Sequence, residues 1–117
     1  MKSRAEVVIT GLGAVTAAGL NVEETWNSLT QGRQSVSQLN INIQGQCHNY
    51  GAGQVDDFSG PKSMDRCAQF ALHCAHEALA QAGLSENSEY LRRAACVFSM
   101  SKPSPSLFAE LYQLYKR

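Results

Sequence analysis

The sequence of 117 residues lacks any charge imbalance, because ten Lys and Arg residues offset ten Asp and Glu residues. A net charge of zero gives the chain no net attraction to nucleic acid or to an anionic membrane, so we expect neither as a partner. No apolar run approaches the ~20 residues of a membrane span. Only about four apolar residues precede Thr10 and Gly11, too few for a signal peptide. We therefore expect the chain in the cytoplasm.

Metal-binding and disulfide patterns are also missing. The four cysteines, Cys47, Cys67, Cys74 and Cys96, form no C-x-x-C pair. Cys74 and His76 are two residues apart on an expected helix, so their side chains diverge. Without secretion a disulfide framework is not expected. The sequence predicts four reduced thiols, three of them in core positions, with no metal and no other cofactor.

The most informative stretch is VVITGLGAVT at residues 7–16. Its first four residues are continuously apolar rather than alternating, which predicts a strand buried on both faces. Gly11 and Gly13 then allow a turn where a side chain would clash. A dinucleotide fingerprint would need a third glycine or alanine at position 16, which is Thr, and a helix directly after the loop. A small nucleotide-binding domain is therefore a disfavoured alternative.

A first helix is predicted from Asn21 to Gly32. Asn21 is a suitable N-cap, Glu24 completes a capping box, and Gly32 suits the position just after the helix. One apolar stripe is formed by Val22, Trp26 and Leu29. We expect this helix to cover one face of a sheet.

Residues 34–60 have a weaker pattern. Apolar side chains alternate as in an edge strand, and glycines then punctuate a hairpin or an irregular connection. The alternating residues are Val36, Leu39, Ile41 and Ile43, and the glycines are Gly45, Gly51 and Gly53. Asp56 and Asp57 are neighbours whose carboxylates point apart, which favours solvated turn residues over a pair for acid–base catalysis.

The clearest helix is predicted for Ser63 to Gly83, with Ser63 as its cap and Gly83 with Leu84 as its stop. Small residues recur at steps of three or four, a stripe that permits close approach of a sheet or another helix. The stripe comprises Met64, Ala68, Ala71, Ala75, Ala78 and Ala82. His73 and Glu77 lie one turn apart, and we interpret them as a surface ion pair rather than a catalytic dyad.

Beyond this helix, residues 94–99 (AACVFS) predict a second buried strand. Ser104 and Pro105 then suit the N-cap and first position of a last helix. Its apolar face would comprise Leu107, Leu111, Leu114 and Tyr115.

Two spaced motifs resemble the start of the β-ketoacyl-acyl-carrier-protein synthases, which open V-V-[IV]-T-G-[LM]-G-x-[VL]-[TS]-x-x-G. Every fixed place of that pattern is filled between Val7 and Gly19. The second motif matches at Met64-Asp65-Arg66, Phe70-Ala71, Ala75, Ala78-Leu79 and Ala82-Gly83-Leu84. Between the motifs, Val55-Asp56-Asp57-Phe58 resembles the V-x-D-F-like element of the family.

The resemblance implies an α/β chain that is the N-terminal portion of a thiolase-like α-β-α-β-α fold, incomplete on its own. Residues 1–117 would form one truncated domain, with the expected strands at residues 7–10 and 94–99 as parallel neighbours. The family's reaction is decarboxylative condensation of acyl and malonyl thioesters in fatty acid or polyketide biosynthesis, with acyl carrier protein as partner. The resemblance places the family's nucleophilic cysteine and two catalytic histidines beyond Arg117. None of the cysteines or of His48, His73 and His76 is therefore assigned a catalytic role.

One departure from the family affects the substrate site. The second expected strand should lead into a G-[ST]-G-x-G-G turn near the acyl-binding pocket, but residues 99–104 read SMSKPS. Proline fixes φ and does not make the same turn. By position, Ser101 and Lys102 are the substrate-binding candidates. Because this turn departs from the family pattern, the acyl specificity and the reaction of the family are not carried over to this chain with it.

We expect the chain alone to be inactive, and the alternative is a non-catalytic module for interaction or dimerisation with a synthase. A missing remainder would leave a helix face and a sheet edge uncovered, which predicts self-association.

Overall fold

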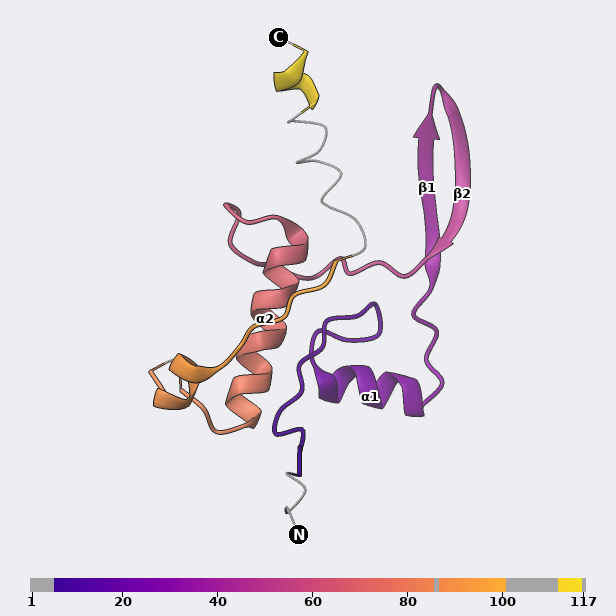
Figure 1. Ribbon diagram of the computed structural model, residues 1–117. Coiled ribbons are helices and arrows are strands. Elements are labelled where there is room, and N and C mark those ends of the chain that lie inside the picture. Colours follow the sequence, from indigo (N-terminus) through magenta and orange to yellow (C-terminus); the bar gives the residue numbers. More distant parts are fainter. Residues whose placement is uncertain (1–5, 86, 101–111, 117) are drawn as a thin grey trace.

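The computed structural model describes residues 6–85, 87–100 and 112–116. In chain order it contains helix α1 (Val22–Thr30), strands β1 (Ser37–Ile43) and β2 (Gln46–Ala52), helix α2 (Arg66–Gln81) and the 3₁₀ helix η1 (Glu89–Arg93), as Figure 1 shows. Residues 112–115 form a further helical turn, while the expected start of that last helix lies outside the described residues. Helices and a two-stranded sheet make this a partial α/β structure.

The predicted caps of α1 are confirmed. The Asn21 side chain accepts a hydrogen bond from the Glu24 N–H at 2.8 Å. The Glu24 carboxylate accepts from the Leu20 N–H, one residue earlier than an ideal capping box. Gly32 has a φ of 63°, and the Arg33 N–H donates to the Ser28 carbonyl at 2.9 Å. This is a Schellman ending, in which only glycine adopts the positive φ without strain.

Helix α2 ends as predicted but begins later. Its N-cap is Asp65 rather than Ser63, because the Asp65 carboxylate accepts from the Cys67 N–H at 3.2 Å. The turn before it is closed by the Met64 N–H, which donates to the Pro61 carbonyl. At the other end, Gly83 has a φ of 68° and the Leu84 N–H reaches the carbonyl five residues earlier.

Of the two alternatives for residues 34–60, the hairpin is present, with β1 and β2 paired antiparallel in the register Leu39–Tyr50 and Ile41–His48. Its turn consists of Gln44 and Gly45, both with positive φ, which is the geometry that matches the twist of the strands.

The two buried strands expected at residues 7–10 and 94–99 are not formed. Neither segment has regular secondary structure, and both are exposed, with Val7 at 95% and Val97 at 92% exposure. A parallel strand needs hydrogen-bonding neighbours and a covering layer on each face. The described residues supply neither, so the prediction was wrong for this chain.

No hydrophobic side chain among the described residues is buried, and Ser28 is the buried residue of that part. The apolar side chains of the described residues are therefore partly or fully exposed and form no buried core. No described helix is long and apolar enough to cross a membrane.

Candidate functional site

Residues 11–20, which we call the glycine turn, lie directly against the backbone of α2. A Cβ on Gly11 would fall 2.0 Å from the Ala78 carbonyl oxygen, and one on Gly13 would fall 1.9 Å from that of Cys74. Neither glycine has a positive φ among the described residues, so close approach rather than backbone freedom requires them. The small-residue stripe of α2 permits this approach at Ala78, but it receives a turn instead of the sheet or helix that we expected.

Glu77 holds two points of the N-terminal segment at once. One carboxylate oxygen accepts from the Ala14 N–H at 2.9 Å, and the other accepts from the Val22 N–H at 2.8 Å. Val22 is the first residue of α1, so a single side chain of α2 fixes both the glycine turn and the helix that follows it. The N–H groups of Val22 and Ala14 hold the pKa of this carboxyl below its usual range.

The side chains one turn to either side of Glu77 extend this contact. Gln81 accepts from the Leu12 N–H through its side-chain oxygen at 2.6 Å. The His73 ring nitrogen Nε2 lies 2.9 Å from the Leu20 carbonyl, to which its N–H donates. His73, Glu77 and Gln81 thus form a polar stripe that binds backbone groups of residues 12–22. His73 and Glu77 bind the glycine turn and the start of α1 instead of serving chiefly as the surface ion pair we predicted.

The glycine turn is also closed on itself and tied to α1. Thr16 and Gly19 exchange backbone hydrogen bonds at 2.8 and 3.2 Å. The Thr16 hydroxyl lies 3.0 Å from that of Thr25. Gly19 is packed against α1, because an added Cβ would lie 2.5 Å from the Glu24 Cβ. The backbone of the glycine turn is therefore held in place by contacts with α2 on one side and with α1 on the other.

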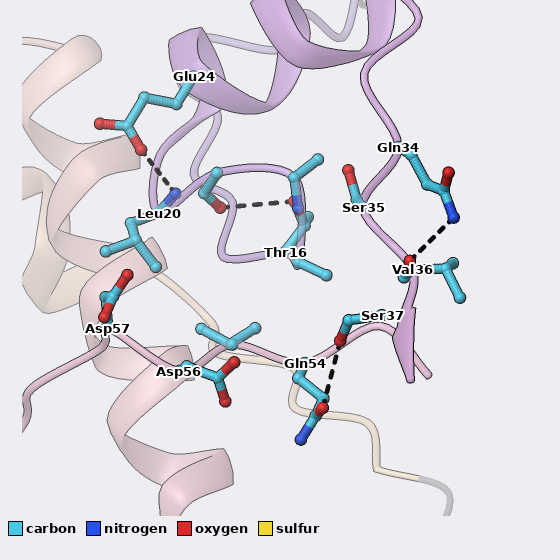
Figure 2. A pocket seen from close by; sticks show the side chains of 14 residues that line it. Thr16, Leu20, Glu24, Gln34, Ser35, Val36, Ser37, Gln54, Asp56 and Asp57 are labelled. Carbon is cyan, nitrogen blue, oxygen red and sulfur yellow. Dashed lines mark hydrogen bonds between the residues drawn. The ribbon is translucent and has the colours of Figure 1, made fainter. Parts of the chain in front are cut away.

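Beside this turn lies an open cavity of about 470 Å³ (Figure 2). Its walls are residues 16–20, Glu24 and the two segments that enter and leave the hairpin, residues 34–37 and 54–57. Hydrogen bonds from Gln34 to the Val36 carbonyl and between Ser37 and Gln54 brace the hairpin side. Asp56 and Asp57 are exposed at its rim, as expected for solvated turn residues. Among the described residues, the side chains that line the cavity present hydroxyls, amides and carboxylates, and none presents a thiol or imidazole that could form a nucleophile–base pair.

The described part of the chain contains no group of three His, Cys, Asp or Glu residues that could hold a metal ion. The expectation of three thiols in core positions was wrong, because Cys47, Cys67 and Cys96 are exposed and Cys74 is half-buried under the glycine turn. Partial burial, and secondarily the Glu77 carboxylate, raise the pKa of the Cys74 thiol.

We therefore expect Cys74 to be alkylated several-fold more slowly by iodoacetamide at pH 8 than Cys67, which is exposed on the same helix. The thiolate is the reacting species, so a raised pKa and restricted access both slow the reaction. Peptide mapping by mass spectrometry at timed quenches gives both rates in one sample. The Glu77→Gln variant should speed modification of Cys74 and leave Cys67 unchanged. Equal rates for the two thiols in the wild type would contradict this placement of the turn.

The substrate-binding candidates Ser101 and Lys102 lie outside the described residues. Sequence reasoning missed Gln81 as a partner of the glycine turn and assigned Glu77 a different role. The sequence did contain a signal for these two roles. His73, Glu77 and Gln81 recur at intervals of four, which places three polar side chains on one face of a helix that is otherwise largely small or apolar.

Comparison with known proteins identifies the segment. The family described as beta-ketoacyl synthase, N-terminal domain, matches residues 4–113. The chain is 29% identical over 98 residues to 3-oxoacyl-[acyl-carrier-protein] synthase 2 of Staphylococcus aureus strain COL, covering 75% of this chain and 24% of the relative. It is 34% identical over 86 residues to a protein of Streptomyces violaceoruber named as granaticin polyketide β-ketoacyl synthase 1, covering 67% of this chain and 20% of the relative.

A protein of Streptomyces coelicolor named as actinorhodin polyketide β-ketoacyl synthase 1 is 32% identical over 90 residues, 70% of this chain and 19% of the relative. No solved structure gives a significant match. The chain spans at most about a quarter of the length of these curated relatives. The match over residues 4–113 includes both sequence motifs and all the contacts between the glycine turn and α2, and it shows that the chain belongs to the β-ketoacyl synthase family, whose N-terminal domain it represents.

Proposed function

We propose that this chain supplies the N-terminal portion of a β-ketoacyl-acyl-carrier-protein synthase. The complete synthase would condense acyl and malonyl thioesters with loss of carbon dioxide, with acyl carrier protein as partner, in fatty acid or polyketide biosynthesis. The observation that carries this proposal is the family match over residues 4–113. The relatives include a 3-oxoacyl-[acyl-carrier-protein] synthase and two polyketide β-ketoacyl synthases, so the proposal names both pathways and does not choose between them.

The exposed apolar segments support a larger fold. Residues 7–10 and 94–99 have the composition of buried strands but no partner strands among the described residues. We infer that they become neighbouring parallel strands in a thiolase-like α-β-α-β-α core, of which residues 1–117 are one part. The rest of the synthase would cover the apolar surface, a gain of about 25 cal/mol for each Å² removed from water.

Within such a synthase the residues of this chain have a positioning role. The reaction needs a thiolate nucleophile that forms an acyl-enzyme, and groups that stabilise the enolate and oxyanion. We assign these groups to the remainder of the synthase, because neither the cavity beside the glycine turn nor the half-buried Cys74 offers a nucleophile with a base. We propose that Ser101 and Lys102 lie near the acyl chain, in place of the glycine-rich turn of the family.

The test is a condensation assay with acyl- and malonyl-loaded carrier proteins, read as release of carbon dioxide. We expect no product from the chain alone. An immunoblot of source cells with antibody to residues 66–81 should detect a product several times heavier than 12.7 kDa, and the protein isolated with that antibody should condense. Condensation by the 12.7 kDa chain alone would overturn the proposal.

The alternative is a non-catalytic module that binds a synthase. The exposed apolar surface of the described residues supports this alternative, because such a surface is typical of a binding site for another protein. In that case the immunoblot would show a 12.7 kDa band alone, and the chain would co-purify with a separate, larger synthase.

A further inference from the structure

Residues 53–58, which we call the exit segment, lead from the hairpin toward α2 and are attached to that helix by an arginine and by aromatic rings. The Arg66 guanidinium donates a hydrogen bond to the Val55 carbonyl and lies over the Phe70 ring, 5.1 Å from its centroid. The Phe58 ring meets the Phe70 ring edge to face, with 4.9 Å between centroids and an interplanar angle of 82°. Aromatic rings attract each other in this arrangement.

His73 joins the exit segment to the glycine turn. Its ring meets the Phe58 ring edge to face, with 5.3 Å between centroids and an interplanar angle of 88°. Its Nε2 lies 2.9 Å from the Leu20 carbonyl. The side chain of His73 is exposed, so burial does not hold the imidazole in place. These two contacts therefore define where the ring lies, and they connect it to two segments that are distant in the sequence.

The two segments joined in this way are walls of the same cavity. Residues 16–20 form one wall and residues 54–57 form another, as Figure 2 shows. The walls come together at Gly53, where an added Cβ would lie 3.2 Å from the Ala17 Cβ. On the side of α2 they are linked through the His73 ring. The spacing between the walls therefore depends on a single exposed side chain at that end.

We propose that Phe58 and His73 form a latch that couples the exit segment to the glycine turn, so that these two walls of the cavity open and close together. Phe58 is a positioning residue, because its ring holds the imidazole where Nε2 reaches the Leu20 carbonyl. Without that ring the imidazole rotates about its side-chain torsions, which weakens a hydrogen bond that depends on direction. Coupling between two sites is reciprocal, so loosening either wall loosens the other.

Amide hydrogen exchange in the 117-residue chain at pH 7 tests the latch. The Val22 amide reports how firmly the chain beyond Leu20 is seated on α2, since it donates to Glu77. Its exchange should rise about 2- to 12-fold in Phe58→Leu, which is the weight of one aromatic pair. The matched control is Tyr50→Leu, which removes the ring of another aromatic–histidine pair, formed within β2. This control should leave the Val22 amide unchanged.

A double-mutant cycle separates a latch from two independent contacts. His73→Ala should raise exchange of the Val22 amide, and adding Phe58→Leu should cause no further rise, because Phe58 acts on the turn through the imidazole. Independent contacts would multiply the two effects. In the opposite direction, Glu77→Gln should loosen the turn and change the NMR ring-proton shifts of Phe58. The same substitution should leave those shifts unchanged when His73 is already alanine.

A conservative variant links the effect to the aromatic contact. Phe58→Tyr keeps the ring and should keep the wild-type exchange of the Val22 amide. Unchanged exchange in Phe58→Leu, an equal rise in Tyr50→Leu, or a further rise on adding Phe58→Leu to His73→Ala would each overturn the proposal. The proposal does not rest on the proposed function, since its readout is amide exchange within this chain and not condensation.

Discussion

Replacement of Gly13 by alanine is expected to detach the glycine turn from α2. The added Cβ would lie 1.9 Å from the Cys74 carbonyl oxygen and within 3 Å of two further backbone atoms of that residue. A backbone carbonyl in a helix cannot rotate away, so the turn must move and its hydrogen bonds to Glu77 must lengthen or break. Overpacking of this kind costs about 1–3 kcal/mol, which corresponds to a roughly 5- to 150-fold rise in the open population.

Hydrogen exchange at the Ala14 and Val22 amides measures this effect, because both amides donate to Glu77. Their protection should fall together in the Gly13→Ala variant. The control is Gly51→Ala, where the nearest atom to an added Cβ is a Val36 methyl group at 3.4 Å, an ordinary contact. Adding Cys74→Ala to Gly13→Ala should give no rescue, since the clash is with backbone. Unchanged protection in Gly13→Ala would show that the turn is not seated on α2.

Substitution of Glu77 by glutamine is expected to loosen the same turn without a steric clash. A carboxylate accepts from the Ala14 and Val22 N–H groups through its two oxygens, whereas an amide has one oxygen and an NH₂ group that would face a donor. One N–H therefore loses its partner, at a cost of about 1–3 kcal/mol. Glu77→Ala removes both acceptors and should release the turn further. The control is Glu23→Gln, because Glu23 is exposed on the first turn of α1.

The acid response of the wild type follows from the same contact. The N–H groups of Val22 and Ala14 lower the pKa of Glu77 in the folded state, so the unfolded chain takes up its proton first as the pH falls. The stabilisation is fully present above the ordinary glutamate pKa of about 4.3 and is lost as the pH drops below that value through the lowered pKa. Amide proton shifts of Ala14 and Val22, followed by NMR from pH 7 to pH 2, should report this loss. The same shifts should be flat in Glu77→Gln, and a wild-type midpoint above the ordinary value would reverse the sign and refute the assignment.

Local signals in the sequence predicted the helices and the hairpin well. The Asn21 cap, the glycines after both helices and the alternation of residues 36–43 each act through neighbours within a few residues. One cap was misplaced, because both Ser63 and Asp65 can begin a helix and the turn closed by Met64 and Pro61 decides for the latter. The family resemblance was also readable, since two spaced motifs carried it and the family match over residues 4–113 confirms it.

The strands at residues 7–10 and 94–99 failed for a physical reason. Their composition encodes burial between layers, but a strand exists only where other strands accept and donate its hydrogen bonds. The partners are not among the described residues, so the same apolar sequence remains without regular structure and exposed. Composition thus predicted buried strands, which these segments would form between other strands and covering layers. In this chain the segments are exposed and irregular instead.

By itself, the sequence determined helices α1 and α2 with all their ends except the first residue of α2, the hairpin, and membership of the β-ketoacyl synthase family, because each depends on short-range patterns. The tertiary structure alone decided why Gly11 and Gly13 are glycines and what Glu77 and Gln81 bind. Those answers depend on residues more than fifty positions apart, brought together when the glycine turn settles on α2. Local propensity cannot predict such long-range contacts. Their free energy depends on both segments together, and it is gained only when the chain between them has folded so that the two segments are adjacent.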